Sequence, residues 1–242
     1  MALLALALAL ALVTVFMPAA APLFRHFWPD VTPPVYGFAS FPSLLLSHAE
    51  IVAAASAAAA AAALVLGIAA TRPWGRDFRP ILGSLATIGQ TFPPVAVLAI
   101  AVPALGYGDL PTFVAVALYG FLPVVANVIA GLEGVPTAVR EAALGMGLSP
   151  RQILWRVELP LAAPVILAGV RTSVVIAIGT ATIGSTVGAV TLGTPIIDGL
   201  VGDKLPYVIE GAVVVALFAI VADLAFERLD RFFRRHAGAA TP

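Results

Sequence analysis

The chain has 242 residues, of which 61% are hydrophobic and 11% charged, and its mean hydropathy is +1.04. This composition excludes a soluble domain, and the net charge of zero gives no sign of a nucleic-acid partner or a polybasic membrane patch. The absence of cysteine excludes disulfides, Fe–S clusters and thiol catalysis. Apolar runs of about 20 residues, without strand-like alternation, predict an all-α polytopic membrane protein.

Six apolar stretches predict about six transmembrane helices, near residues 2–24, 44–70, 81–105, 111–132, 161–185 and 207–226. The first is rich in Ala and Leu, which favours a helix in lipid. A cleaved signal peptide is the alternative, supported by the small residues at 19–21 but lacking a Lys/Arg-rich start. The third stretch is broken near its centre by Pro93 and Pro94.

The basic residues between these stretches are unevenly distributed. Ten lie in loops that fall on one side of the membrane: Arg72, Arg76, Arg79, Arg140, Arg151, Arg156, Arg228, Arg231, Arg234 and Arg235. The opposite loops hold only Arg25 and Lys204. The excess predicts that both termini and the loop at 136–160 face the cytoplasm.

The polar stretch at 136–160 contains the start and stop signals of two short helices. The first is expected to begin at Pro136–Thr137 and to end at Gly145–Gly147. Its spacing predicts one shallow apolar face, formed by Val139, Ala143 and Met146.

The second helix is expected to open with a capping box, in which Ser149 is the N-cap and Gln152 lies three residues later. It is expected to end before Pro160 and to have an apolar side made of Ile153, Leu154 and Val157. Physical reasoning alone leaves two interpretations open: a helix in the headgroup region, or a docking element for a cytoplasmic partner.

The spacing of this stretch resembles the EAA loop of ABC-importer permeases, E-A-A-x₃-G-x₉-I-x-L-P. The matching residues are Glu141, Ala142, Ala143, Gly147, Leu159 and Pro160, with Val157 in place of isoleucine. Residues 86–100, 117–135 and 159–184 are similar to the osmoprotectant branch, whose members import glycine betaine, choline and carnitine. The chain departs from that branch at 188–193, where G-A-V-T-L-G stands for G-A-G-G-L-G, so Val190 and Thr191 replace two glycines. This departure bears on the geometry of the segment and on the cargo.

The resemblance implies a type I importer transmembrane domain at 44–226, preceded by a helix and outward-side loop at 1–43 and followed by a basic tail at 227–242. It implies an ATPase-coupling role for Glu141, Ala142, Ala143, Gly147, Arg151, Leu159 and Pro160. Implied partners are a dimeric cytoplasmic ATP-binding subunit, an extracytoplasmic substrate-binding protein, and an identical or paralogous second permease subunit. Localisation in a bacterial or archaeal inner membrane follows from the same resemblance.

The chain itself is expected to be a transporter subunit, not an enzyme, with no cofactor or metal. No G-x₄-G-K-[S/T] motif occurs, and Lys204, the only lysine, lacks that context, so ATP and Mg²⁺ are expected on another chain. The alternatives are a permease of the same architecture for an amino acid or oxyanion, an ion-gradient-driven transporter, and a non-transporting scaffold. A gradient-driven transporter would need inverted repeats and buried carboxylates, which the sequence does not show.

Polar residues within the apolar stretches are candidates for the translocation pathway: Gln90, Thr91, Pro93, Arg171, Thr180 and Thr182. Ordinary interhelical hydrogen bonding explains the neutral ones equally well, and an interhelical lock is favoured for Arg171. Glu50, Glu210 and Asp223, near the ends of apolar stretches, are interpreted as snorkelling or paired, and His48 as interfacial.

Overall fold

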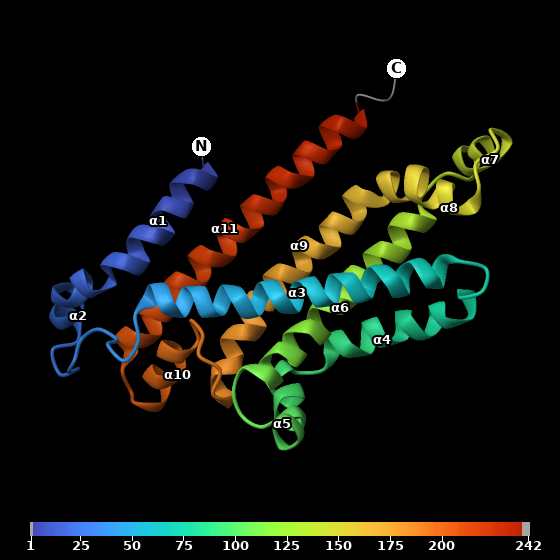
Figure 1. The fold of residues 1–242 in the computed structure, drawn as a ribbon. Helices are drawn as coiled ribbons and strands as arrows, with labels where there is room; N and C mark the ends of the chain where they lie inside the picture. Colours follow the sequence, from blue (N-terminus) through green and yellow to red (C-terminus); the bar gives the residue numbers. More distant parts are fainter. Residues whose placement is uncertain (1, 239–242) are drawn as a thin grey trace. The chain divides into compact units, whose positions relative to one another are not determined.

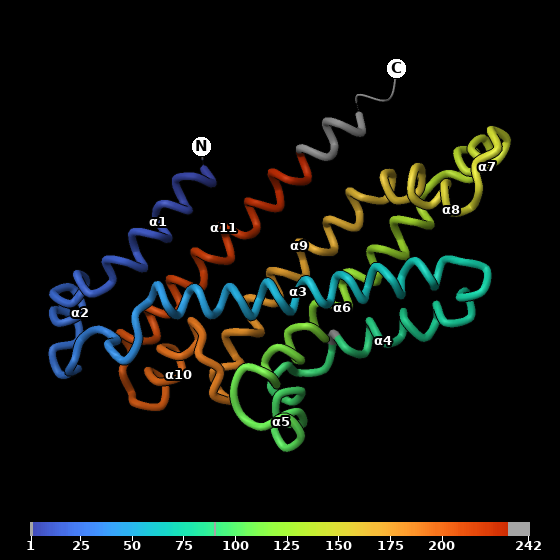
Figure 2. Tube along the Cα trace, viewed as in Figure 1, coloured from blue at the N-terminus to red at the C-terminus, as the bar shows by residue number. Residues whose placement is uncertain are grey.

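A computed structural model describes residues 2–238, with the side chains of Gln90 and of residues 232–238 outside the described part (Figures 1 and 2). Its elements within these residues are helices only. Five helices are long and apolar enough to cross a membrane, or six if one broken pair forms a single span. The prediction of an all-α membrane protein with about six spans is therefore confirmed.

The N-terminal half contains three candidate spans and the broken one. Its helices are α1 (Ala2–Phe16), η1 (Met17–Ala20), α2 (Ala21–Phe27), α3 (Phe41–Thr71), η2 (Arg76–Phe78), α4 (Arg79–Thr91), α5 (Pro94–Leu105) and α6 (Asp109–Glu133). The break falls between α4 and α5, as predicted, because Phe92 and Pro93 are extended and neither Pro93 nor Pro94 has an N–H to continue the ladder.

The C-terminal half holds two further spans and several short helices. They are α7 (Thr137–Gly145), α8 (Pro150–Ile153), the π-helix η3 (Leu154–Glu158), α9 (Leu159–Gly184), η4 (Ser185–Val187), α10 (Thr194–Val201) and α11 (Leu205–Gly238). The sequence analysis has no counterpart for α10, whose eight residues are too few to give a spanning signal.

The described chain forms two compact units. Unit 1 contains the residues up to Ala55, Pro93–Ala117 and Val174–Ala225; unit 2 contains Ser56–Phe92, Leu118–Ser173 and the residues from Phe226 onward. In unit 1, α1 and α11 share a buried cluster that includes Leu10 and Val214. In unit 2, α3, α6 and α9 share one that includes Ala63, Val128 and Ile166.

Small residues let the helices of unit 2 approach closely. A Cβ at Gly67 of α3 would lie 2.6 Å from Val128 of α6, and one at Gly169 of α9 would lie 2.6 Å from Asn127. These contacts are of the small-residue kind that drives helix packing in lipid, where burial of apolar surface contributes little.

Two ionisable residues of unit 1 lie deeper than the sequence predicts. His48 is fully buried, and its Nδ1 accepts a hydrogen bond from the Leu192 backbone at 3.3 Å. Glu210 is only 1% exposed, and its Oε2 accepts a hydrogen bond from the Tyr36 backbone at 3.0 Å. The interfacial interpretation of His48 and the snorkelling alternative for Glu210 are wrong, because neighbouring segments fold over both side chains.

The segment at 188–193 accommodates Val190 and Thr191 in place of the two expected glycines. Only Gly188 there has a positive φ, of 87°, so the backbone at Val190 and Thr191 does not demand glycine. The buried Thr191 hydroxyl donates to the Ala181 carbonyl at 3.1 Å and accepts from the Gly193 amide at 3.0 Å. The retained Gly193 is needed, because a Cβ there would lie 2.0 Å from the Thr182 carbonyl oxygen.

Candidate functional site

The α7 helix of unit 2 ends in a Schellman motif. Gly147 adopts φ +80° just beyond the helix, and its amide donates to the Leu144 carbonyl at 2.9 Å. The next amide, of Leu148, donates to the Ala143 carbonyl at 3.2 Å. This pair of bonds defines the motif, and the left-handed position at its centre favours glycine. The predicted end of the first short helix is therefore confirmed, with Gly147 as the residue that reverses the chain.

The second helix begins with the predicted capping box. The Ser149 side chain accepts a hydrogen bond from the Gln152 amide at 3.4 Å, and the Gln152 side chain accepts one from the Ser149 amide at 2.8 Å. The α7–α8 hairpin, defined as Thr137–Ile153, is thus fixed locally at its turn. Ile153 is buried, whereas Arg151 is exposed.

The predicted end before Pro160 is wrong, because the chain stays helical through that residue. After α8 it passes through the five-residue π-helix η3 and directly into α9 at Leu159. The Leu159 amide donates back to the Leu154 carbonyl, so the wider π turn carries the ladder up to the proline. Pro160 then occupies the start of α9, where its missing N–H does least harm.

The predicted apolar face of α7 is only partly present. Ala143 is buried, but Met146 lies beyond the helix end and is 74% exposed. Large apolar side chains are instead exposed on the hairpin and the adjoining π-helix, at Leu144, Met146 and Trp155. Exposed apolar side chains beside exposed Glu141 and Ala142 suit a contact surface for another protein.

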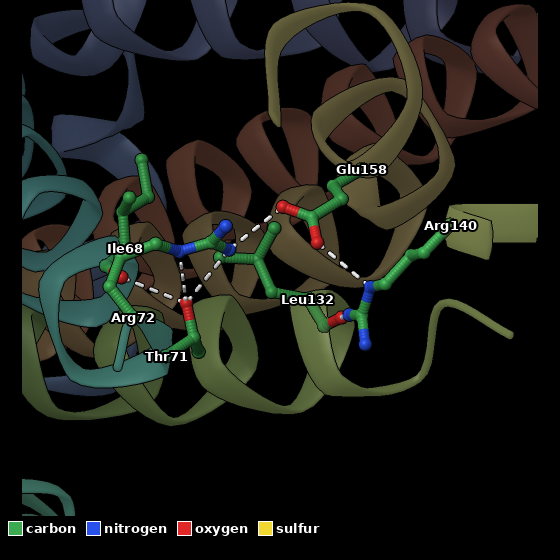
Figure 3. A network of polar contacts seen from close by, with 6 residues as sticks. All are labelled: Ile68, Thr71, Arg72, Leu132, Arg140 and Glu158. Carbon is green, nitrogen blue, oxygen red and sulfur yellow. Dashed lines mark hydrogen bonds and ion pairs between the residues drawn. The ribbon is translucent and has the colours of Figure 1, made fainter. Parts of the chain in front are cut away.

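A buried carboxylate joins this hairpin to the ends of other helices (Figure 3). Glu158 of η3 is 4% exposed, and its two oxygens form ion pairs with Arg72 Nη2 and Arg140 Nε, each at 2.8 Å. Arg72 directly follows α3, and Arg140 lies in α7.

The two arginines also hold backbone and side-chain oxygens of the neighbouring helices. Arg140 donates to the Leu132 carbonyl of α6, and Arg72 donates to the Thr71 hydroxyl at 3.1 Å. That hydroxyl donates in turn to the Ile68 carbonyl at 2.8 Å. We call the three charged residues Arg72, Arg140 and Glu158 the Glu158 junction. It ties α3, α6, α7 and η3 together at one point.

The junction forms part of the wall of a charged cleft of about 600 Å³. Four arginines and two glutamates line it: Arg72, Arg76, Arg79, Arg140, Glu133 and Glu158. Glu133, at the end of α6, pairs with Arg79 at 2.7 Å, but both side chains of this pair are well exposed. The cleft therefore combines one buried ionic network with one solvent-exposed pair.

Sequence reasoning missed the Glu158 junction. Glu141, the acidic residue of the EAA-type spacing, is exposed and forms no ion pair among the described side chains. The available signal was an acidic residue between Val157 and Leu159, in a row of side chains that otherwise turns inward. A lone acid on an inward-facing row needs a cationic partner.

The pathway candidates are divided between the two units. Thr91 and Arg171 lie in unit 2, with Thr91 exposed and Arg171 half-buried, whereas Pro93, Thr180 and Thr182 lie in unit 1. Each of the three threonine hydroxyls donates to a carbonyl of its own helix, at 2.8–3.0 Å. Their bonds are thus within helices, not between them, and the Gln90 side chain lies outside the described part.

The packed membrane helices and the capped EAA-type hairpin define a permease subunit of an ABC importer. The chain belongs to the family described as "Binding-protein-dependent transport system inner membrane component", which matches residues 63–235. It is therefore a multi-pass membrane protein of that transporter class.

Relatives in this family are similar over most of their length. The "Osmoprotectant import permease protein OsmY" of Salmonella typhimurium is 39% identical over 170 residues, covering 70% of this chain and 72% of the relative. The "Choline transport system permease protein OpuBB" of Bacillus subtilis is 41% identical over 166 residues, covering 69% and 76%. The "Glycine betaine/carnitine/choline transport system permease protein OpuCB" of the same organism is 38% identical over 174 residues, covering 69% and 80%.

Solved structures of ABC importers share the fold. A permease chain in "Inward facing conformations of the MetNI methionine ABC transporter" aligns with a TM-score of 0.68 at 20% identity, covering 78% of this chain and 93% of that one. A chain of an amino acid ABC transporter aligns with a TM-score of 0.62 at 18% identity, covering 92% and 98%. At these identities the likeness concerns the fold alone.

Proposed function

We propose that this chain is the pore-forming subunit of an ATP-driven importer and that the α7–α8 hairpin is where a cytoplasmic ATPase pushes on it. The observation that carries this proposal is the Glu158 junction. A hairpin that only covered a helix end would need no buried ionic connection to three other helices. Glu158 pairs with Arg72 at the end of α3, and Arg140 donates to Leu132 near the end of α6, so a displacement of the hairpin moves both helices with it.

The EAA-type residues divide into two structural roles in this proposal. Exposed Glu141, Ala142 and Arg151 contact the ATPase, with exposed Leu144 and Met146 as apolar neighbours. Buried or turn-forming residues give the surface its shape: Ala143 packs inward, Gly147 reverses the chain, and Leu159 and Pro160 start α9.

We further propose that both chain termini and the hairpin face the cytoplasm of a bacterial or archaeal cell, across its inner membrane. The loop arginines support this orientation, since ten of them fall on the hairpin side of the predicted topology. The basic tail at 227–242, much of which lies outside the described part, has the same location in this proposal.

The division of labour implied by the family supplies the other components of the importer. ATP and Mg²⁺ bind to a separate dimeric ATPase, and this chain carries no cofactor of its own. A second permease copy or paralogue completes the pore, and an extracytoplasmic binding protein delivers the solute. The absence of a phosphate-binding motif from the sequence supports the separate ATPase.

The proposed cargo is an osmoprotectant of the glycine betaine, choline or carnitine type. Three relatives at 38–41% identity bear such names. The departure at Val190 and Thr191 gives no structural reason against this cargo, since the segment needs no glycine at either position. Gln90, Thr91, Pro93, Arg171, Thr180 and Thr182 stay proposed pathway residues.

A reconstituted importer tests the cargo and the energy source together. The permease is purified with its associated subunits, placed in proteoliposomes, and its ATPase rate is measured with the binding protein loaded with glycine betaine, with choline, or empty. The proposal expects stimulation by a loaded binding protein and uptake that stops without ATP. Stimulation by an amino acid or oxyanion alone would identify another cargo, and uptake that survives ATP depletion but collapses with the ion gradient would overturn the ABC mechanism.

Variants of the hairpin test its coupling role separately. Glu141→Lys reverses a charge on the proposed contact surface, and Gly147→Leu places a bulky side chain at φ +80°. Both variants should insert in the membrane yet hydrolyse ATP without matching uptake. Wild-type uptake per ATP in both would contradict the assignment of the hairpin.

A further inference from the structure

The short connection between α3 and α4 places its basic side chains and its aromatic side chains in two different surface hollows. The sequence from Arg72 to Arg79 reads RPWGRDFR, with basic and aromatic residues interleaved. Arg72, Arg76 and Arg79 line the charged cleft, whereas Trp74 and Phe78 line a separate groove. The loop therefore separates a polar cleft from an apolar groove, and both lie within unit 2.

The cleft carries an excess of positive charge. Four arginines and two glutamates line it, which leaves a net of two positive charges. Ion pairs with glutamates engage Arg72, Arg79 and Arg140, and those of Arg72 and Arg140 are with the buried Glu158. Arg76 is exposed and forms no ion pair among the described side chains. It presents donors to an anion, and its own charge supplies one of the two net positive charges of the lining.

The groove beside it is apolar throughout. It has a volume of about 320 Å³ and is lined by Leu66, Ala69, Ala70, Trp74, Gly75, Phe78, Ile81 and Leu82. Trp74 is 73% exposed and Phe78 61% exposed. Such aromatic residues at the end of a membrane helix are typical of the boundary between lipid headgroups and acyl chains.

The shape of the loop is fixed by a close approach at its centre. Gly75 is buried, and a Cβ there would lie 2.1 Å from the Ala69 carbonyl oxygen of α3. The turn therefore closes tightly on the end of α3, which keeps the arginines on the cleft and the aromatic side chains on the groove. The site is built by the backbone and does not depend on a ligand to form.

We propose that this loop binds a phospholipid with an anionic headgroup, whose phosphate lies at Arg76 in the cleft and whose acyl chain lies in the groove over Trp74 and Phe78. A free phosphate ion would use the cleft but leave the groove empty. An acidic segment of a partner protein would also have no use for a groove of purely apolar lining at a membrane-helix end. An anionic lipid satisfies the charged cleft and the apolar groove together, and the inference is independent of the cargo.

The test uses the purified importer in mild detergent and native mass spectrometry of bound lipid. Phosphatidylglycerol and phosphatidylcholine with identical acyl chains are titrated separately, and soluble glycerol phosphate is added as a competitor. The variants are Arg76→Gln and Trp74→Ala, both at exposed positions. The matched control is Arg25→Gln, which removes the same charge from an exposed arginine of α2, beside exposed Phe27, that does not line the cleft.

The wild-type protein should retain phosphatidylglycerol in preference to phosphatidylcholine. Arg76→Gln should weaken phosphatidylglycerol binding about five-fold, the usual effect of one basic residue near an anionic surface, and Arg25→Gln should leave it unchanged. Trp74→Ala should weaken the binding of both lipids. Equal effects of Arg76→Gln and Arg25→Gln would overturn the proposal. Displacement of phosphatidylglycerol by glycerol phosphate would show a free-anion site instead. If Arg76→Gln lost the ATPase subunit but bound lipid as the wild type does, Arg76 would be a protein contact, and the proposal would be overturned.

Discussion

Glu158→Gln is the substitution that tests force transmission most directly. It keeps the size of the side chain but removes the charge that both Arg72 and Arg140 approach at 2.8 Å. Loss of one member of a buried ionic network costs about 3–5 kcal/mol. The two arginine side chains are 22% and 31% exposed and regain water when released, so we expect about 2 kcal/mol here.

That free energy sets the size of the effect on transport. A weakening of about 2 kcal/mol corresponds to about a 30-fold smaller population of the intact junction relative to the broken one. Uptake per ATP hydrolysed should therefore fall by up to about 30-fold, while the ATPase subunit stays bound, because the contact surface of the hairpin is unchanged. The measurement is solute uptake and phosphate release in the same proteoliposomes, with thermal unfolding of each variant recorded in detergent.

Glu133→Gln is the matched control. It makes the same chemical change in the same cleft, but its ion pair with Arg79 is 37% and 53% exposed and contributes about 0–1 kcal/mol. The double variant Glu158→Gln/Arg140→Gln should lose less than the sum of the two single variants, because the two residues share one interaction. Equal coupling in Glu158→Gln and Glu133→Gln would refute the reasoning, as would strict additivity in the double variant.

Three further predictions concern stability, measured by thermal unfolding unless stated. Gly147→Ala should lower the free energy of unfolding by about 1–2 kcal/mol, because Gly147 has a positive φ. Gly145→Ala, with open space around it, should be neutral or slightly stabilising. Equal shifts in the two variants would contradict the Schellman assignment. Thr191→Gly should lose about 1–3 kcal/mol because it removes the hydroxyl bonds to the Ala181 carbonyl and the Gly193 amide, and a gain in stability would count against the role given to that hydroxyl. Burial and the hydrogen bond to Asp198 raise the pKa of Tyr36 well above its usual range. The stabilisation from the neutral phenol is then full below about pH 10 and lost as the pH rises further, so Tyr36→Phe should flatten this alkaline decline, and an unchanged decline would exclude Tyr36 as its source.

The spans and the hairpin could be predicted because their signals are local. A helix in lipid satisfies its own backbone, so a long apolar run specifies it without reference to the rest of the chain. The capping box at Ser149 and the chain reversal at Gly147 likewise depend on bonds within a few residues. The EAA-type spacing could be recognised because its residues all lie within positions 141–160.

The errors occurred where a neighbouring segment decides the outcome. The end before Pro160 seemed necessary from the proline alone, but the π turn of η3 carries the helix through it. His48 seemed interfacial, and snorkelling seemed open to Glu210 near a span end. Residues far away in sequence, Leu192 and Tyr36, donate hydrogen bonds to these two buried side chains. Two missing glycines seemed to alter the 188–193 segment, yet Thr191 fits because its hydroxyl finds partners there.

Composition, run length and motif spacing were enough to predict that this protein crosses the membrane several times and has a capped hairpin of the EAA type. Periodicity, length and capping act over one helix or one turn, and the sequence lists those residues consecutively. The folded arrangement of the helices was needed to show that Glu158 and Arg140 hold the hairpin to α3 and α6, and that the α3–α4 loop separates a charged cleft from an apolar groove. Those features depend on which helix ends meet in space, because an ion pair acts over a few ångströms and its partners here are far apart along the chain.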